Sequence, residues 1–387
     1  MRILLNGVGR IGKAILRITL TNKAFTIVAI NELNPNIKSI AYSINYDSTY
    51  GTINDKFVIS GDCIENSTRK IAILNHTSLQ EINLQNIDVI IDASGSKVDI
   101  KELKQLPVKA IFLTHPNKDA DINVILGVNE KSLNLNVHKV ISTSSCNATA
   151  LLPVLKLIDE SKKIEFGDIV TIHPFLNHQK VLDSGCIGNQ NRGVECNLEF
   201  GRSATQNIIP SQTTTIEACS YVIEHINSNV ITSSSLRVPT STVGAISVTL
   251  FLKNSCSKEE IINLCQAYEK NQQFDILLNN HEPLVSSDFQ AQRYTTIVDH
   301  RFTDVKVEKM LKLLIWYDNE WGYASKVVDI VQKIFNIRKG IMNIAIVGAG
   351  LVGRVVALNL LRKPFSTTYF NSLEYAKSSP PHGLEIF

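Results

Sequence analysis

Residues 6–12 read Asn-Gly-Val-Gly-Arg-Ile-Gly, and this glycine-rich run constrains the fold more than any other part of the chain. It follows a short apolar run and opens a segment with helical spacing of its apolar residues, which is typical of a strand, a turn and a helix. Gly7 permits the tight turn, Gly9 lets the backbone approach a phosphate group, and Gly12 lets the helix pack close to the strand. Because free N–H groups at the start of a helix bind anions, the run predicts a dinucleotide-binding unit.

A carboxylate follows the second strand that is predicted in this unit. The apolar run 25–30 ends at Asn31, and Glu32 comes about twenty residues after the last glycine of the turn. A carboxylate in this place accepts hydrogen bonds from the ribose of adenosine and repels the 2′-phosphate of NADP. The sequence therefore predicts NAD as the cofactor, with NADP as the alternative.

The composition is that of an ordinary globular protein. Of the 387 residues, 44% are hydrophobic and 19% are charged, which indicates about two domains. The net charge of +3 is too small to favour a nucleic acid or a membrane as the main partner. No apolar run is long enough to cross a bilayer, and the seven cysteines lack the spacing of metal ligands. We therefore expect a cytoplasmic protein with reduced thiols and no metal site.

The first part of the chain alternates strand and helix patterns. Three further buried strands are predicted from apolar runs, at residues 87–92, 109–114 and 137–142. Ligands of open α/β sheets bind beyond the carboxyl ends of such strands, where Ser94, Gly95 and Thr114 lie. These small residues are candidates for cofactor contact, and the alternative is that they only form turns.

The pattern changes in the second half of the chain. Residues 245–252 alternate apolar and polar side chains, as in an antiparallel sheet with one covered face. Ser257 and Glu260 are spaced as a capping box that starts a helix. A last strand is predicted at 311–317 and a last helix at 323–335. An α+β unit therefore follows the nucleotide-binding unit, and the last helix is expected to return to the latter.

The C-terminal segment holds a second glycine-rich turn. Residues 342–353 repeat the pattern of strand, GxGxxG turn and helix start, and no clear second strand follows them. One βα unit cannot complete a dinucleotide crevice or bury a core of its own. We interpret residues 342–387 as a short, truncated βα extension that binds no cofactor.

A cysteine and a histidine are the candidate chemical centre. Cys146 lies between a predicted strand and a helical run, and a thiol at a helix N-terminus is favoured as thiolate. A later strand, 168–172, delivers His173, which could hold the thiolate and act as acid or base. Taken alone, a single cysteine is more often a core residue, and a single histidine more often has a structural role.

Six segments occur together in an order that resembles one family. They are residues 6–12, 140–153, 171–173, 206–210, 236–240 and 316–323. Together they resemble the phosphorylating glyceraldehyde-3-phosphate dehydrogenases and their erythrose-4-phosphate dehydrogenase relatives, over about residues 1–338. The resemblance implies an α/β protein with a doubly wound (Rossmann) NAD domain of residues 1–147 plus 316–338. It also implies an α+β catalytic domain of residues 148–315 with a mostly antiparallel sheet.

The resemblance implies a mechanism and assigns residues to it. The Cys146 thiolate attacks an aldehyde of a small sugar phosphate, His173 takes the hydroxyl proton as hydride leaves for NAD, and phosphate or water cleaves the thioester. Residues that match positions around the dinucleotide are Arg10, Ile11, Asn319 and Tyr323. Residues that match positions around the substrate and inorganic phosphate are Ser145, Asn147, Thr213, Thr214 and Arg237. Family members are homotetramers.

Several positions depart from the family pattern. Asn147 follows the cysteine where the family has threonine, and Thr214 stands where it has glycine. Leu176 occupies the position at which glyceraldehyde-3-phosphate dehydrogenases carry a phosphate-binding threonine. The loop 184–201 is also longer than usual, which puts the contact between subunits in doubt. These changes weaken the binding of inorganic phosphate more than the chemistry.

Two hypotheses follow from these departures. Leu176 favours the erythrose-4-phosphate branch, in which water largely hydrolyses the thioester, with glyceraldehyde-3-phosphate as the alternative substrate. The second hypothesis is a catalytically impaired relative that serves as a binding protein. The retention of Cys146, His173, Arg237 and Asn319 argues against it.

Overall fold

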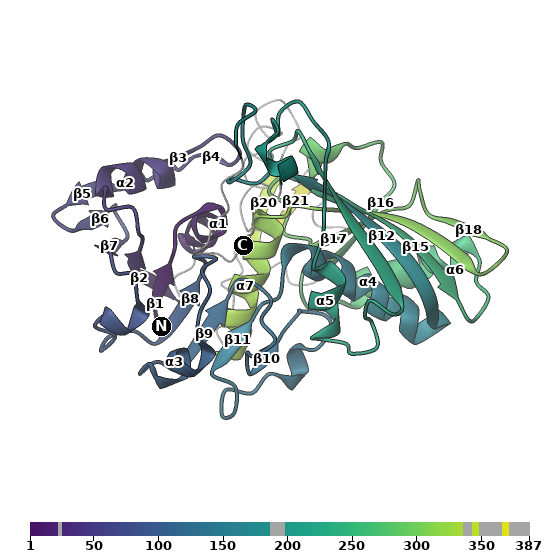
Figure 1. The fold of residues 1–387 in the computed structure, drawn as a ribbon, viewed down its shortest axis with the longest axis horizontal. Coiled ribbons are helices and arrows are strands. Elements are labelled where there is room, and N and C mark those ends of the chain that lie inside the picture. The colour runs from purple at the N-terminus through teal and green to yellow at the C-terminus, as the bar shows by residue number, and fades with distance from the viewer. Residues whose placement is uncertain (22–24, 186–197, 336–342, 348–365, 371–387) are drawn as a thin grey trace.

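The computed structural model describes residues 1–21, 25–185, 198–335, 343–347 and 366–370. Two large sheets organise it, one built from residues 2–142 and one from residues 164–317. In the view of Figure 1, helix α7 (Trp321–Ile334) stands between the two sheets.

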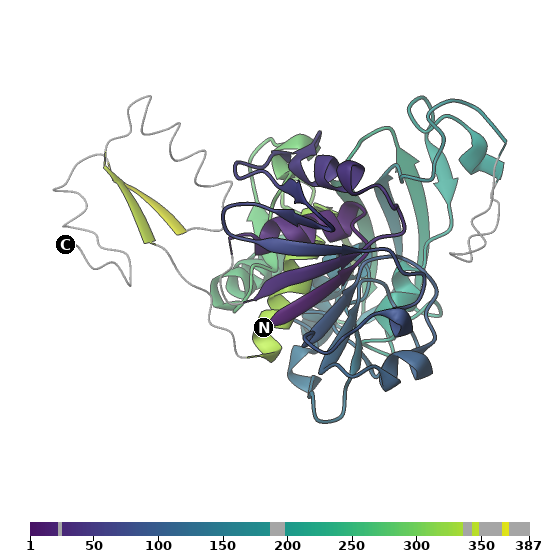
Figure 2. The same cartoon turned by 90° about the vertical axis from the view of Figure 1, so that its left-hand side faces the viewer.

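The first sheet has nine strands in the order β10-β11-β9-β8-β1-β2-β7-β6-β5. Neighbours run parallel from β10 to β7, and β6 and β5 form an antiparallel edge. The strands are β1 (Arg2–Asn6), β2 (Thr26–Asn31), β5 (Val58–Ser60), β6 (Cys63–Glu65), β7 (Lys70–Leu74), β8 (Val89–Asp92), β9 (Ala110–Leu113), β10 (Ile122–Asn123) and β11 (Val140–Ser142). The helices of this part are α1 (Arg10–Thr19), α2 (Ile37–Asn45) and α3 (Ile100–Gln105), and β3 (Tyr46–Asp47) pairs with β4 (Gly51–Thr52). Figure 2 shows the purple and blue strands of this sheet from the side.

Both faces of the first sheet are covered. Successive side chains of a strand point to opposite faces, so Leu4 joins a core with α3 while Ile3 and Leu5 join a core with α1 and α7. A parallel sheet with two buried faces needs helices on both sides. The prediction of a doubly wound nucleotide-binding fold is therefore confirmed.

The second sheet has eight strands, and its main path runs in the order β13-β14-β12-β15-β19-β17-β16. The pairs β12–β14 and β16–β17 are parallel and the other pairs are antiparallel, so the sheet is mostly antiparallel as predicted. The strands are β12 (Ile164–Pro174), β13 (Ile209–Ser211), β14 (Ile231–Val238), β15 (Gly244–Leu252), β16 (Leu277–Asn280), β17 (Thr296–Asp299), β18 (Asp304–Lys306) and β19 (Met310–Tyr317). The helices are α4 (Cys146–Lys162), α5 (Thr215–Ser220) and α6 (Lys258–Asn271).

One face of the second sheet is buried, and helix α4 packs on it. Ile246, Val248 and Leu250 of β15 are buried in one core with Leu151 and Leu155 of α4. The alternation that predicted an antiparallel strand at 245–252 therefore reflects a half-covered sheet. The predicted capping box at the start of α6 is also present, with both of its reciprocal hydrogen bonds.

Element boundaries differ from the predicted ones by a few residues. The strands predicted at 87–92, 109–114 and 137–142 are shorter, and the last one starts at Val140 because the N–H of Val137 bonds Asn134 in a turn. Helix α7 begins at Trp321 rather than at 323. The Asp318 carboxylate accepts the N–H groups of Glu320 and Trp321 at 2.9 and 2.8 Å, which satisfies the first donors of the helix.

The C-terminal segment contains a strand that the sequence did not reveal. Strand β20 (Asn343–Val347) pairs in parallel with β21 (Ser366–Phe370) in a separate two-stranded sheet. The expectation that no second strand follows the tail's glycine turn was therefore wrong. The turn itself and the predicted helix after it lie outside the described residues.

The close approach between α1 and the glycine turn gives a prediction about stability. A Cβ atom on Gly12 would lie 2.1 Å from the Gly7 carbonyl oxygen, whereas one on Gly9 would meet no atom within 4 Å. We expect Gly12→Ala to lower the free energy of unfolding by about 1–3 kcal/mol, because the helix must move away from the turn. Thermal unfolding measures this effect. Gly9→Ala is the matched control, and equal losses in both variants would contradict the packing argument.

Candidate active site

The glycine turn and the predicted acidic residue meet in the structure. Gly7 has a φ of +86°, which favours glycine, and its N–H donates to the Asn31 carbonyl at 2.8 Å. The Glu32 carboxylate accepts the N–H of Val8 at 2.9 Å, so it ties the turn to the end of β2. A carboxylate has about four acceptor positions, and the remaining ones suit ribose hydroxyls.

Arg10 follows the turn, and its side chain bonds to two acidic residues. Its guanidinium makes two hydrogen bonds to Glu320, at 2.8 and 2.6 Å, and pairs with Asp47. Burial opposes this charge, but Glu320 and Asp47 together raise the pKa of Arg10. The guanidinium therefore joins α1 to the start of α7 and to β3. Ile11, the next matched residue, is only partly buried on α1.

A hollow lies beyond the carboxyl ends of β8 and β9. Its volume is about 400 Å³, and it is lined by Gly95, Ser96, Lys97, Val98, His115, Pro116 and Asn117. The hydroxyl of Thr114 donates to the Asp92 carbonyl at 3.0 Å, while Ser94 is the second residue after β8. Gly95 thus lines the hollow, whereas the Thr114 hydroxyl holds the strand ends together. The turn, the helix start, Glu32 and this hollow together fit a dinucleotide.

Cys146 is the first residue of helix α4. Ser145 precedes it as the N-cap, and the Ser145 hydroxyl accepts the N–H of Ala148 at 3.2 Å. The Cys146 Sγ lies 3.8 Å from Nε2 of His173 and 3.5 Å from Oδ1 of Asn147. The predicted pair of cysteine and histidine is therefore brought together across 27 positions of the chain.

His173 is held in the form that can accept a proton from the thiol. It stands near the end of β12, and its Nδ1 lies 2.8 Å from the carbonyl oxygen of Pro174. A carbonyl only accepts, so Nδ1 carries the hydrogen and Nε2 keeps its lone pair toward Cys146.

Burial acts against a thiolate on Cys146. It raises the pKa of Cys146 to about 11, although Arg237 and nearby backbone N–H groups work in the opposite direction. Burial also lowers the pKa of His173 to about 3, and Arg237 adds to this effect. Both directions favour the neutral forms of the two groups. A proton transfer from Sγ to Nε2 leaves the net charge of the pocket unchanged, so the geometry is compatible with such a transfer.

Arg237 lies beside the pair and has buried donors. It is the register partner of His173 on the parallel strand β14, so the two side chains leave the same face of the sheet. Among the described residues, no group accepts a hydrogen bond from its buried Nε or Nη1. Burial lowers the pKa of Arg237, and a guanidinium remains charged at any physiological pH. A buried fork of free donors suits an anion such as a sugar phosphate.

Two residues near the start of α7 were expected to contact the cofactor. The Asn319 Oδ1 accepts the N–H of Val243 at 3.1 Å. The NH₂ group of Asn319 therefore points away from Val243. The Tyr323 hydroxyl lies 2.9 Å from the Thr143 hydroxyl and donates to the Ser144 carbonyl at 3.0 Å. Tyr323 is buried and holds the loop before Cys146, and its contact with the cofactor stays a prediction.

The residues predicted around inorganic phosphate differ in their exposure. Asn147 is buried beside Cys146, and Thr213 reaches it through Thr215, whereas Thr214 is exposed before α5. Sequence reasoning missed Thr215 and Tyr317, which both bond to Asn147. Tyr317 lies inside the predicted motif 316–323, and this position is the sequence signal that could have identified it as a site residue.

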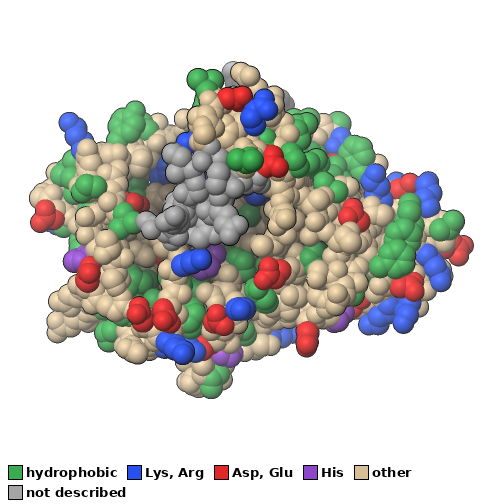
Figure 3. All heavy atoms as spheres, viewed as in Figure 1, with side chains coloured by type: hydrophobic (Ala, Val, Ile, Leu, Met, Phe, Trp, Pro, Cys, Tyr) green, Lys and Arg blue, Asp and Glu red, His purple; other side chains and the backbone are tan. Residues whose placement is uncertain are grey.

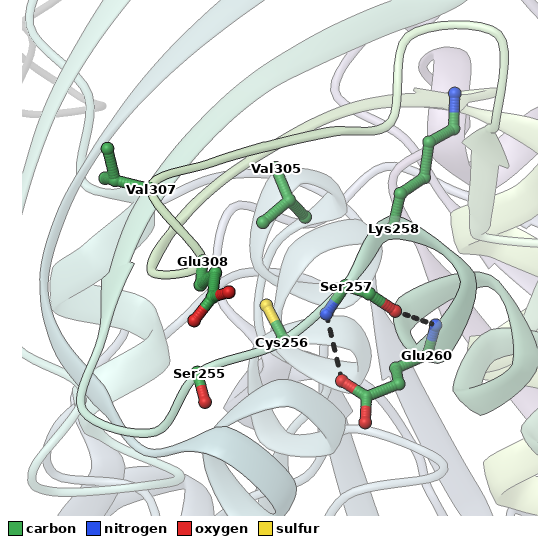
Figure 4. Close-up of a pocket in the computed structure, with 8 residues that line it drawn as sticks. All are labelled: Ser255, Cys256, Ser257, Lys258, Glu260, Val305, Val307 and Glu308. Carbon is green, nitrogen blue, oxygen red and sulfur yellow. Dashed lines mark hydrogen bonds between the residues drawn. The ribbon is translucent and has the colours of Figure 1, made fainter.

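Another hollow, drawn in Figure 4, lies at the start of α6. Its volume is about 610 Å³, but Ser257 and Glu260 on its wall bond to each other in the capping box. It is near the end of the sheet where Phe251 pairs with Met310, whereas His173 lies toward the opposite end of the same strands. This hollow is therefore not part of the site around Cys146.

Comparisons with known proteins agree with this geometry. Residues 1–100 match the model of the NAD binding domain of glyceraldehyde 3-phosphate dehydrogenase, and residues 145–319 match its C-terminal domain. The chain is 30% identical to glyceraldehyde-3-phosphate dehydrogenase 2 of Bacillus subtilis (strain 168) over 340 residues, which cover 86% of this chain and 96% of that protein. The chain belongs to the glyceraldehyde-3-phosphate dehydrogenase family. It is also 32% identical to glyceraldehyde-3-phosphate dehydrogenase 2 of Staphylococcus aureus (strain MRSA252) over 339 residues, 86% of this chain and 95% of that one.

Family membership makes the chain an NAD-dependent dehydrogenase. The matched NAD binding domain includes the glycine turn and Glu32, so NAD is the cofactor. Within the described residues, no helix is long and apolar enough to cross a membrane. On the face drawn in Figure 3, acidic and basic side chains are interspersed, without the continuous basic surface that nucleic acids require.

The proton relay from Cys146 to His173 gives a testable prediction. At pH 7.5, we expect His173→Asn to slow the alkylation of Cys146 by iodoacetate by about 10–100-fold, because the proton acceptor is lost. In the variant the thiol loses its proton only to solvent. Because burial raises the pKa of Cys146 to about 11, the rate of its alkylation should rise steeply as the pH approaches that value. The difference between the two proteins should therefore shrink toward pH 10. The alkylation of Cys63 serves as the internal control, and a gap that stays constant with pH would contradict the relay.

Proposed function

We propose that this dehydrogenase oxidises a phosphorylated aldose, with a thiohemiacetal and then a thioester on Cys146. The observation that carries the proposal is the 3.8 Å approach of the Cys146 Sγ to the unprotonated Nε2 of His173. Arg237 supports the substrate class, because its buried donors face the same end of the sheet and suit a phosphate group.

His173 and the start of helix α4 have different roles in the proposed reaction. His173 takes the thiol proton as Sγ forms its bond to the aldehyde carbon, and the N–H of Cys146 at the helix start stabilises the oxyanion. His173 then gives this proton to the oxyanion, which becomes the thiohemiacetal hydroxyl. His173 takes the hydroxyl proton back as hydride leaves the carbon, and this proton passes to solvent. Bound NAD supplies the acceptor for hydride. Water or phosphate completes the cycle by cleaving the thioester.

We propose erythrose-4-phosphate as the preferred substrate and glyceraldehyde-3-phosphate as the alternative. Support comes from Leu176, whose side chain brings no hydroxyl to a position three residues after His173. The relatives named above carry the glyceraldehyde name, which supports the alternative. The proposal also includes a cytoplasmic homotetramer, domains of residues 1–147 plus 316–338 and 148–315, and a tail, 342–387, that this activity does not need.

NADH formation tests the proposal. The two aldehydes are compared in separate assays, each with and without inorganic phosphate. Turnover of erythrose-4-phosphate that does not depend on phosphate supports the preferred substrate, and phosphate-dependent turnover of glyceraldehyde-3-phosphate supports the alternative. If neither aldehyde yields NADH while NAD still binds, the chain is a binding protein and the proposal is wrong.

A further inference from the structure

Asn147 connects the nucleophile to a buried chain of hydrogen bonds. Its side chain is 8% exposed, and it follows Cys146 directly on helix α4. Tyr317 donates to its Oδ1 at 2.7 Å, and its Nδ2 donates to the Thr215 hydroxyl at 3.1 Å. Asn147 is thus bonded to residues from β19 and α5, two elements that are distant in the sequence.

In this arrangement the carbonyl oxygen is the end of the carboxamide that faces the sulfur, with Oδ1 3.5 Å from Sγ. The NH₂ group faces Thr215. Tyr317 cannot shift easily, because it is 1% exposed and packs so closely on Gly244 that a Cβ there would lie 2.6 Å from its ring.

Two hydroxyl groups close to Asn147 bond to each other. The hydroxyls of Thr215 and Thr213 share a hydrogen bond of 2.6 Å, so one of their two hydrogens is used between them. The Ser145 hydroxyl accepts the N–H of Ala148 as the helix cap. A phosphate ion needs several donors together with no facing acceptor, whereas here a carbonyl oxygen points toward the sulfur. Water, in contrast, can donate a hydrogen bond to that oxygen.

We propose that Asn147 determines which acceptor releases the acyl group from Cys146, and that it selects water over phosphate. This inference rests on the proposed function, because it requires a thioester on Cys146. Oδ1 of Asn147 accepts one O–H of the incoming water and repels an anion. Asn147 is a positioning residue in this step, while His173 moves the proton.

The hydrolytic step balances with the groups present. The water oxygen forms a bond to the thioester carbon as one water proton passes to Nε2 of His173. The tetrahedral intermediate collapses, the bond between carbon and Sγ breaks, and Sγ takes the proton from His173. The products are a carboxylic acid, which releases its proton to solvent, and the free Cys146 thiol. No oxidant is consumed, because the oxidation is complete when the thioester forms.

The test measures how the acyl group partitions between the acid and the acyl phosphate. The full-length enzyme reacts with NAD, erythrose-4-phosphate and increasing inorganic phosphate, and the quenched products are separated by chromatography. The unchanged enzyme should form mainly the acid at every phosphate concentration. Asn147→Thr cannot reach Thr215 and carries no carbonyl, so its share of acyl phosphate should rise about tenfold. The acyl phosphate share is expressed per NADH formed, so a change in the rate of the oxidation step does not alter the measured partition.

Two further variants make the test decisive. Thr215→Val removes the acceptor of Nδ2 and lets the carboxamide turn, so it should also raise the acyl phosphate share. Thr149→Val is the matched control, because its hydroxyl is one turn along α4 and bonds to no described residue. The inference is overturned if NADH forms normally and neither Asn147→Thr nor Thr215→Val changes the partition. Absence of NADH in the unchanged enzyme would instead overturn the proposed function.

Discussion

Cys146→Ala is expected to lower kcat/KM for the phosphorylated aldehyde by on the order of 10⁴-fold or more. The reason is that the thioester needs a sulfur nucleophile, and the Cys146 Sγ lies 3.8 Å from the base Nε2 of His173. NAD binding should persist, because the glycine turn and Glu32 lie at the ends of β1 and β2 in the first sheet. The measurement is initial-rate NADH formation together with an NAD titration by calorimetry.

The control for this variant is another cysteine. Cys63 is a partly buried free thiol on β6, at the edge of the first sheet. Cys63→Ala should retain activity within about twofold of the unchanged enzyme. Residual activity of Cys146→Ala within tenfold of the parent would show that the nucleophile lies elsewhere.

Arg237→Leu is expected to lower kcat/KM for the phosphorylated aldehyde by about 10²–10³-fold. The variant removes a charged fork whose Nε and Nη1 are buried without acceptors among the described residues, which is where the substrate phosphate would bind. With unphosphorylated glyceraldehyde the same substitution should change kcat/KM by less than about threefold, because no phosphate is lost from the interaction. Comparing the two substrates therefore separates anion recognition from chemistry.

Arg237→Lys sharpens this test. It keeps a positive charge near Cys146 but cannot make two parallel hydrogen bonds, so we expect an intermediate loss of about tenfold with the phosphorylated substrate. If Arg237→Leu affected both substrates equally, the guanidinium would act on Cys146 itself and would not bind phosphate.

The parts of the fold that sequence reasoning predicted depend on local patterns. The glycine turn, the alternation along β15 and the capping box of α6 all involve residues close together in the chain. Periodicity and turn chemistry act over such distances, so these predictions were confirmed. Strand β21 was not predicted, because it begins with the polar residue Ser366 and shows no buried-strand pattern.

The parts that could not be predicted depend on long-range contacts. The Arg10 guanidinium bonds to Glu320, about 310 positions away in the chain. Tyr317 bonds to Asn147, which is 170 positions away. The resting state of Cys146 also depends on how deeply the folded chain buries the thiol, which the helix start alone does not reveal. The sequence therefore predicted the pair of Cys146 and His173, but neither its charge state nor the role of Asn147.

The most direct test of the central claim stops the reaction during the first turnover and analyses the quenched enzyme by mass spectrometry. Excess NAD and phosphorylated aldehyde are mixed with enzyme, and both NADH and the mass of each cysteine-containing peptide are measured. We predict a burst of NADH equal to the number of active sites, with the acyl group attached to Cys146 alone. A burst of NADH with no acyl group on Cys146, or with the group on another cysteine, would contradict the account.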